Sequence, residues 1–88
     1  MSLELRYTVT WGTDARTLYY SDSHGRLLLV FDFNLSGGPK SLFLERTCTD
    51  DNNKRVARTP SNCARLEFAV ECAKQFLASC GFTVEVVD

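Results

Sequence analysis

The side chains best suited to chemistry are one histidine and four cysteines. His24 follows Asp22 and Ser23 in the run S-D-S-H-G, whose residue types are typical of a surface turn. A Ser-His-Asp relay needs the three groups to converge beside an oxyanion site, which neighbours on one tight turn seldom do. We therefore expect His24 to be a surface turn residue and the chain to be non-catalytic.

The cysteines are Cys48, Cys63, Cys72 and Cys80, and they include no C-x-x-C pair. Because the chain has a single histidine, no zinc-binding pattern can be written, and we expect neither a metal nor a cofactor. The last three cysteines fall in one predicted helix, two or more turns apart, which is too far for a disulfide between them and leaves Cys48 as the one available intrachain partner. The pattern favours small, buried, reduced thiols, as in a cytoplasmic protein.

Basic and aromatic residues offer a second kind of chemistry, the binding of single-stranded nucleic acid. Lys54, Arg55 and Arg58 form a short basic segment, and the adjacent Tyr19 and Tyr20 are possible stacking platforms. The other candidates are Arg6, Arg16, Arg26, Arg46, Tyr7 and Trp11. However, 10 Lys and Arg against 11 Asp and Glu give a formal net charge of −1, whereas phosphate binding usually needs a basic face. Nucleic-acid binding is therefore the alternative hypothesis.

Length and composition limit the size and class of the fold that positions these residues. The 88 residues suffice for one small domain, spanning residues 1–88. With 44% hydrophobic and 24% charged residues, the composition is that of a soluble globular protein. The N-terminus lacks the basic-then-apolar layout of a signal peptide, and no apolar run is long enough for a membrane helix. We expect a cytoplasmic protein that does not enter a membrane.

Apolar periodicity predicts an α+β fold with a mostly antiparallel sheet of five to six strands and one helix on one face. The helix is expected from Thr59, its N-cap, through Pro60 to Cys80, with Gly81 ending it. Strands are expected over 3–11, 16–21, 26–34, 40–47, a short edge-like segment at 54–58, and 82–86. The order is β-β-β-β-(β)-α-β.

This order of strands followed by a helix resembles that of the small single-stranded-DNA-binding domains of the transcription-coactivator type. The resemblance is one of element order. The final strand over 82–86 departs from that pattern, so no binding residues are transferred from the family to this chain.

Two surfaces are expected to remain uncovered. A helix about 10 Å wide cannot cover a sheet about 25 Å across, and side-chain alternation sends Leu28, Val30 and either Tyr19 or Tyr20 to the opposite face. On the helix, Phe68 and Cys72 fall outside the apolar stripe and form a small apolar patch on the solvent side. The stripe itself comprises Cys63, Leu66, Ala69, Val70, Ala73, Phe76, Leu77 and Cys80.

The sequence thus favours a small, non-catalytic, cytoplasmic interaction domain that acts through a protein partner or as a homodimer. The uncovered sheet face and the Phe68/Cys72 patch are the expected contact surfaces. The alternative is a single-stranded nucleic-acid binder that uses the sheet face and the basic segment at 54–58. An enzyme with an unrecognised site is a third, less favoured hypothesis.

Overall fold

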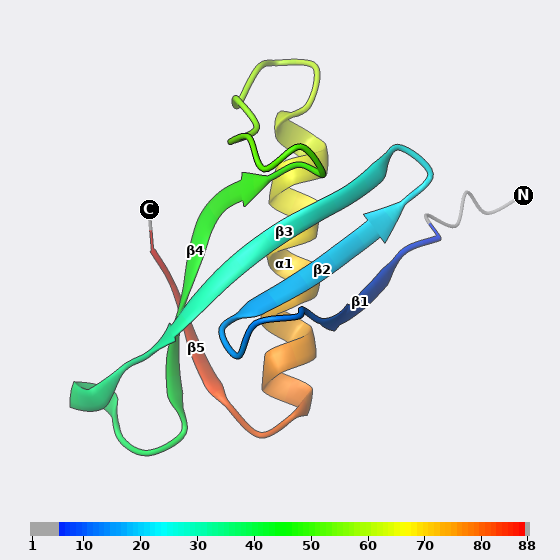
Figure 1. Ribbon diagram of the computed structural model, residues 1–88. Coiled ribbons are helices and arrows are strands. Elements are labelled where there is room, and N and C mark those ends of the chain that lie inside the picture. Colours follow the sequence, from blue (N-terminus) through cyan, green and yellow to red (C-terminus); the bar gives the residue numbers. More distant parts are fainter. Residues whose placement is uncertain (1–5, 88) are drawn as a thin grey trace, which may run out of the picture.

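The computed structural model describes residues 6–87. This part of the chain forms five strands and one α-helix, in the α+β order that the sequence predicts (Figure 1). The elements are β1 (Thr8–Trp11), β2 (Thr17–Asp22), β3 (Gly25–Phe33), a 3-10 turn (Leu35–Gly37), β4 (Ser41–Thr49), α1 (Cys63–Ser79) and β5 (Thr83–Val87). The expected first strand over 3–11 is observed from Thr8, and residues 1–5 lie outside the described residues.

The strands lie in the sheet in sequence order, β1-β2-β3-β4-β5. Successive strands from β1 to β4 are antiparallel, whereas β5 is parallel to β4. A parallel pair needs a long crossover, and α1 supplies it by running back across one face of the sheet (Figure 1). The sheet is therefore a four-stranded meander extended by a β4-α1-β5 unit.

The basic segment at 54–58 does not form the predicted strand. Arg55 makes a single isolated bridge to Thr49. The preceding turn is closed by Asp50, whose Oδ1 accepts hydrogen bonds from the backbone N–H groups of Asn52 (2.9 Å) and Lys54 (3.0 Å). The turn folds the chain back onto the end of β4, where the Asp50 N–H donates to the Lys54 carbonyl and the Val56 N–H donates to the Cys48 carbonyl (both 2.9 Å), and the pairing does not extend beyond this one bridge.

The predicted start of the helix was wrong by about one turn. Cys63 is the first residue of α1, and Asn62 is its N-cap. Residues 59–62 form a separate turn, in which the Thr59 carbonyl accepts from the N–H of Asn62 (3.1 Å) and of Cys63 (2.9 Å). Because the Asn62 side chain accepts from the Thr59 N–H (2.9 Å), it closes this turn and makes no cap hydrogen bond to α1.

The other end of the helix follows the prediction. Gly81 has a φ of +97°, which is costly for residues with a Cβ. The N–H of Gly81 donates to the Ala78 carbonyl (3.0 Å), and the N–H of Phe82 donates to the Leu77 carbonyl (3.1 Å). These two bonds form a Schellman motif, which turns the chain directly into β5.

The core lies between α1 and the sheet. From the helix it takes Leu66, Ala69, Val70, Cys72, Ala73 and Leu77. From the strands it takes Leu18, Tyr20, Leu27, Leu29, Phe31, Leu42, Leu44 and Cys48. Cys63 and Cys80, both expected in the apolar stripe, are exposed at the helix ends. No helix among residues 6–87 is long and apolar enough to cross a membrane.

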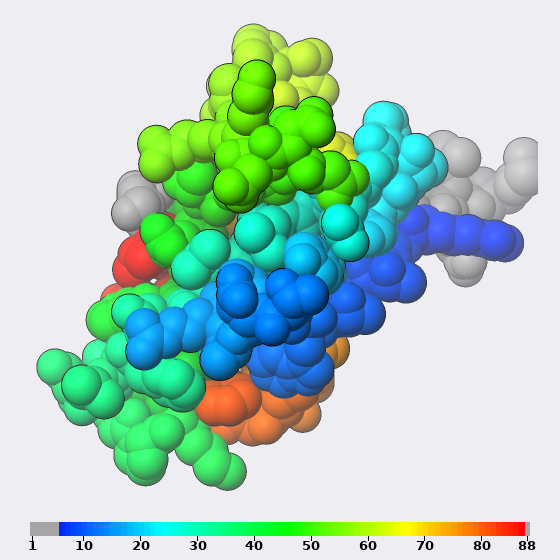
Figure 2. Space-filling view, in the orientation of Figure 1, coloured from blue at the N-terminus to red at the C-terminus, as the bar shows by residue number. Residues whose placement is uncertain are grey.

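The second face of the sheet carries no helix from the described part of the chain, and Figure 2 views the molecule from that side. Tyr19, Leu28 and Val30 lie on this face and are half-buried rather than fully exposed. Two ion pairs flank them: Arg16 with Asp32 (3.1 Å) and Arg26 with Asp51 (2.8 Å). The Arg26 guanidinium also lies 4.4 Å from the centre of the Tyr19 ring. Charged side chains therefore shield part of the apolar surface that the sequence predicts here.

Candidate functional site

The candidate site is the edge of the sheet formed by β1. The Gly12 N–H donates to the Thr17 carbonyl on β2 (2.8 Å), and backbone groups alternate in direction along a strand. The N–H and C=O groups of Thr8 and Thr10 therefore point toward β2. Those of Tyr7, Val9 and Trp11 point outward, where another strand could pair with them.

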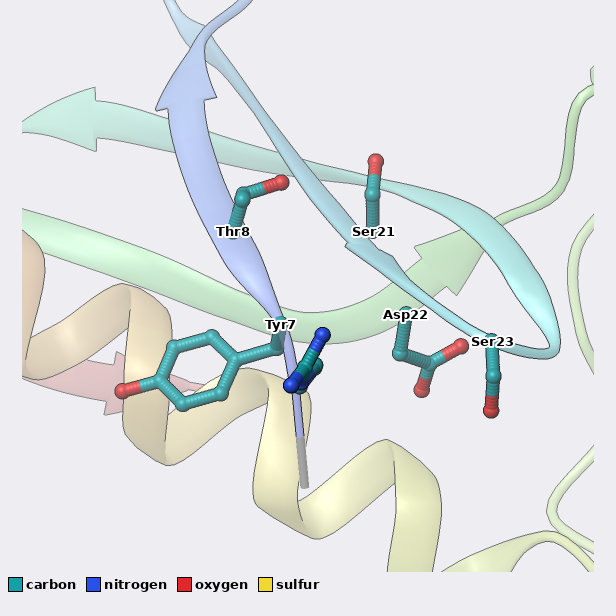
Figure 3. Close-up of a pocket in the computed structure, with 6 residues that line it drawn as sticks. Tyr7, Thr8, Ser21, Asp22 and Ser23 are labelled. Atoms are coloured by element: carbon teal, nitrogen blue, oxygen red, sulfur yellow. The ribbon is translucent and has the colours of Figure 1, made fainter. Parts of the chain in front are cut away.

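The side chains of this edge divide between the two faces of the sheet. Thr8 and Thr10 are paired with Ser21 and Tyr19 of β2 and share the face opposite α1. In Figure 3, Thr8 and Ser21 project to one side of the strands, whereas the Tyr7 ring lies toward the helix. Two steps along the strand, Val9 and Trp11 occupy the same side as Tyr7.

Aromatic contacts anchor both ends of the edge to the helix. The Tyr7 ring stacks on Tyr20 (centroids 5.9 Å apart) and meets the edge of Phe68 (5.3 Å). At the other end, the Trp11 ring makes an edge contact with Phe76 (5.2 Å). Even so, the exposed fractions of Tyr7 and Trp11 are 42% and 50%. Each ring thus packs on the core with one side and presents the other to solvent.

These contacts correct the predicted solvent-side patch. Cys72 is buried, with 7% of its surface exposed, and Phe68 packs partly against the core. Together with Phe76, they form a row at four-residue spacing that lies beneath β1. The sequence pattern misplaced them because α1 contacts the sheet over a wider arc than its apolar stripe, with Tyr7 and Trp11 covering the extra flank.

Cys72 also contacts the Tyr7 hydroxyl. Burial is the main cause of the raised pKa of the Cys72 thiol, and the hydrogen bond with Tyr7 opposes it in part. The same hydrogen bond raises the pKa of Tyr7. Both groups are thus held in their neutral forms near pH 7, as suits a packing contact at the base of the edge.

Beside this edge, a buried ion pair fixes the β2–β3 hairpin to the helix. The Asp22 carboxylate accepts from Arg65 Nε and Nη2, both at 2.9 Å, and its side chain is only 7% exposed. It also accepts from the Tyr20 hydroxyl (2.9 Å) and the His24 N–H (2.8 Å). The Arg65 hydrogen bonds are the main cause of an Asp22 pKa lowered to about 2, against an opposing contribution from burial.

Sequence reasoning did not single out Arg65. The residue sits in the first turn of α1, and its carboxylate partner lies in a distant hairpin. At about 100° per residue, Arg65 falls just outside the predicted apolar stripe, so helical periodicity gave no signal that it is partly buried and needs a counter-charge.

Two depressions flank Asp22. One, of about 330 Å³, lies between β1 and the hairpin and is lined by Arg6, Tyr7, Thr8, Ser21, Asp22 and Ser23 (Figure 3). The other, of about 590 Å³, lies between the hairpin and the first turns of α1, with Phe68 and Ala64 on its apolar side and His24 on its polar side. The surface around the β1 edge is therefore uneven, with hollows next to the exposed Tyr7 ring.

The Asp22, Ser23 and His24 side chains are close but not arranged as a relay. Ser23 Oγ lies 3.4 Å from His24 Nδ1, and Asp22 Oδ1 lies 4.0 Å from the same nitrogen. In a Ser-His-Asp relay, the serine and the carboxylate bind opposite ring nitrogens. Here the carboxylate is instead occupied by Arg65, Tyr20 and the backbone.

The residues predicted for nucleic-acid binding are not gathered in one place. Tyr20 is buried against α1, while Tyr19 lies on the opposite face of the same strand. Lys54 and Arg55 are exposed in the loop after β4. Arg58 binds Glu67 (2.6 Å) and the Arg46 carbonyl (2.8 Å), so it ties this loop to the helix.

Comparisons of the chain with protein-family models, with curated proteins and with solved structures find no match. Among residues 6–87, no group of three or more His, Cys, Asp or Glu side chains is placed to hold a metal ion. All four cysteines are free thiols: Cys48 and Cys72 are buried, and Cys63 and Cys80 are exposed.

Proposed function

We propose that the chain is a non-catalytic protein-interaction domain that binds an extended strand of its partner along β1. The observation that carries the proposal is the combination of an outward-facing edge backbone with two half-exposed aromatic rings, Tyr7 and Trp11. Addition of a strand to a sheet edge draws its affinity from main-chain hydrogen bonds and its specificity from side-chain contacts. Residues 7–11 offer both the main-chain hydrogen-bonding groups and the side chains for such contacts.

The lack of charge on β1 supports the proposal. Proteins commonly protect an exposed edge with charged side chains, proline or a bulge, because an open edge invites pairing. Residues 7–11, Y-T-V-T-W, contain none of these charges or prolines. The opposite edge, β5, carries the exposed carboxylate of Glu85. An uncharged edge is expected where pairing is the purpose.

The Tyr7 and Trp11 rings are also preorganised for binding. Tyr7 is held by Tyr20 and Phe68, and Trp11 is held by Phe76 and Phe31. Aromatic side chains with few rotatable bonds lose little conformational entropy on binding, and these are partly immobilised before a partner arrives. They are therefore the residues expected to contribute most to affinity.

The nucleic-acid alternative has less support from the geometry. Arg16, Arg26, Arg58 and Arg65 each pair with a carboxylate of the same chain. Phosphate binding would have to compete with those partners. Of the exposed aromatic rings, Tyr7 and Trp11 lie beside β1 and Phe33 lies at the end of β3, whereas Lys54 and Arg55 lie in the loop after β4.

Photo-crosslinking tests the proposal. A benzophenone amino acid in place of the exposed Thr10 in the full chain, irradiated in cells, should yield covalent adducts with protein, whereas the same probe in place of the exposed Thr83 on the β5 edge should not. Adducts from both positions, or from neither, would contradict a role for β1. The mass of each adduct also identifies the partner as this chain or another one.

A further inference from the structure

We infer that the partner strand is β1 of a second copy of this chain, paired antiparallel about a two-fold axis at Val9. This inference rests on the proposed function and adds the identity of the partner. A two-fold interface must be self-complementary, because each residue that contacts a position on the other copy is itself contacted by that position. The β1 edge satisfies this requirement in an unusual way.

The sequence around Val9 is nearly symmetrical. Residues 7–11 read aromatic, threonine, valine, threonine, aromatic. Antiparallel pairing centred on Val9 therefore places Tyr7 opposite the second copy's Trp11, and Thr8 opposite its Thr10. Aromatic pairs and threonine pairs are among the favourable cross-strand combinations. The same two contacts occur twice, once on each side of the axis.

The backbone directions agree with this register. The N–H and C=O groups of Tyr7, Val9 and Trp11 point outward, as deduced from the Gly12–Thr17 hydrogen bond. Centring on Val9 pairs outward residues with outward residues, so each such pair exchanges two hydrogen bonds, about six in all. The side chains also match, because the aromatic rings stay on the helix side and the threonines stay on the open face.

The neighbouring register is less favourable. Centring on Thr10 would place Arg6 opposite Asp14, which is a charge match, but Asp14 lies in the turn after β1 rather than in the strand. It would also set Tyr7 against Thr13 and separate the aromatic pairs. The Val9 register uses only residues 7–11 and pairs the two most exposed rings of the edge.

The interface would be small, since it joins one short strand and two rings from each copy. Stable interfaces usually bury about 1,200–2,000 Å², so we expect a reversible dimer that forms with rising concentration rather than a permanent one. Closed two-fold pairing also uses up both β1 edges, which limits growth to a dimer and prevents open-ended strand addition.

Charge variants on the open face test both the dimer and its register. Thr8→Lys with Thr10→Lys places like charges opposite each other twice, whereas Thr8→Lys with Thr10→Glu places opposite charges there. Both threonines are exposed, so either double variant should fold, as circular dichroism and thermal melting will check. The matched control is Thr83→Lys with Glu85→Gln on β5, which adds the same two units of positive charge as the double lysine variant.

The readout is molar mass by analytical ultracentrifugation over a wide range of concentrations of the purified full chain. We expect a monomer–dimer equilibrium that the double lysine variant weakens about tenfold, and that the lysine–glutamate variant and the β5 control retain. A dimer that the double lysine variant leaves unchanged, or that the β5 control weakens as much, would overturn the β1 interface. Weakening by the lysine–glutamate variant would overturn the Val9 register.

A monomer at every concentration would also overturn the inference. If the position-10 crosslinker then gave adducts with another protein, the proposed function would stand with a different partner. If it gave none, the proposed function would fail as well.

Discussion

The β1 edge and the adjoining Asp22–Arg65 junction differ in how their polar groups are satisfied. At the junction, a carboxylate that is 7% exposed receives hydrogen bonds from Arg65, Tyr20 and the His24 backbone. At the edge, the backbone groups of Tyr7, Val9 and Trp11 point outward beside half-exposed rings. The junction completes its interactions within the chain, whereas no second strand within residues 6–87 pairs with the outward groups of the edge.

The difference separates stability from binding. A satisfied, buried charge pair is sensitive to loss of either partner, because the remaining charge stays buried without compensation. An open edge contributes less to folding, since solvent already satisfies its outward groups. Variants at the junction should therefore act mainly on the free energy of unfolding, and variants at the edge mainly on association.

The largest expected effect is that of Asp22→Asn. The change removes the counter-charge of Arg65 and weakens the acceptor for the Tyr20 hydroxyl, and should lower the free energy of unfolding by about 3 kcal/mol. Urea denaturation measures it. The control is Asp51→Asn, which breaks the exposed pair with Arg26 and should cost less than about 1 kcal/mol. Equal losses for the two variants would contradict the distinction between a buried and an exposed pair.

The second effect is the pH dependence of the same junction. The Asp22 pKa is about 2 in the folded chain against a usual value of 3.8, so the unfolded state binds the proton more readily. Asp22 therefore contributes about 2 kcal/mol of stability above pH 4, which is lost as the pH falls toward 2. Urea denaturation at several pH values should show this loss in the wild type. Asp22→Asn should show less of it, and parallel curves would contradict the assignment.

The third prediction concerns the edge. Trp11→Ala removes ring contacts with Phe76 and Phe31, and should cost about 1.5 kcal/mol because half of the ring is already exposed. It should also weaken association through β1. Phe33→Ala, at a ring that is 47% exposed on another strand, should leave association unchanged. If both variants weaken association equally, nonspecific hydrophobic association rather than pairing at the β1 edge is responsible.

The smallest effect is a difference in thiol labelling. In a Cys63→Ser, Cys80→Ser background, the remaining thiols are both buried, with Cys72 beneath β1 and Cys48 on β4 in the core. Burial also raises the pKa of Cys48 to about 11. Local release of a short edge strand needs less free energy than global unfolding, so Cys72 should react faster with a disulfide reagent than Cys48. Equal rates would mean that β1 does not open separately.

Much of the fold could be predicted because local signals and tertiary structure agree. The alternation in β1 and β5, the apolar run of β3 and the glycine that ends α1 each specify their element over a few residues. The start of α1 was less predictable, since Thr59 and Asn62 are both acceptable N-caps. In the structure, Thr59 belongs to the separate turn over residues 59–62 and does not cap the helix. The segment at 54–58 has strand-like residues, but after the Asp50 turn it pairs with the end of β4 at a single bridge and forms no strand.

The candidate site was only partly predictable. Excess apolar strand surface correctly indicates that one helix leaves part of the sheet uncovered. However, the sheet face opposite α1 is shielded in part by the ion pairs of Arg16 and Arg26 with their carboxylates. Phe68 and Cys72 were singled out as unusual, but helical periodicity alone does not reveal that Tyr7 covers them. The sequence pattern identifies surplus apolar residues without locating their neighbours.

By itself, the sequence determined the order of the five strands and the helix and the near-symmetry of residues 7–11, because these depend on apolar patterning, turn residues and local composition; the strand predicted at 54–58 is the exception. Only the tertiary structure decided that β1 is an edge strand, that its rings lie across the Phe68–Phe76 row of α1, and that Asp22 meets Arg65. The reason is physical: strand order and helix position are set by long-range packing of the whole core, which no short stretch of sequence contains.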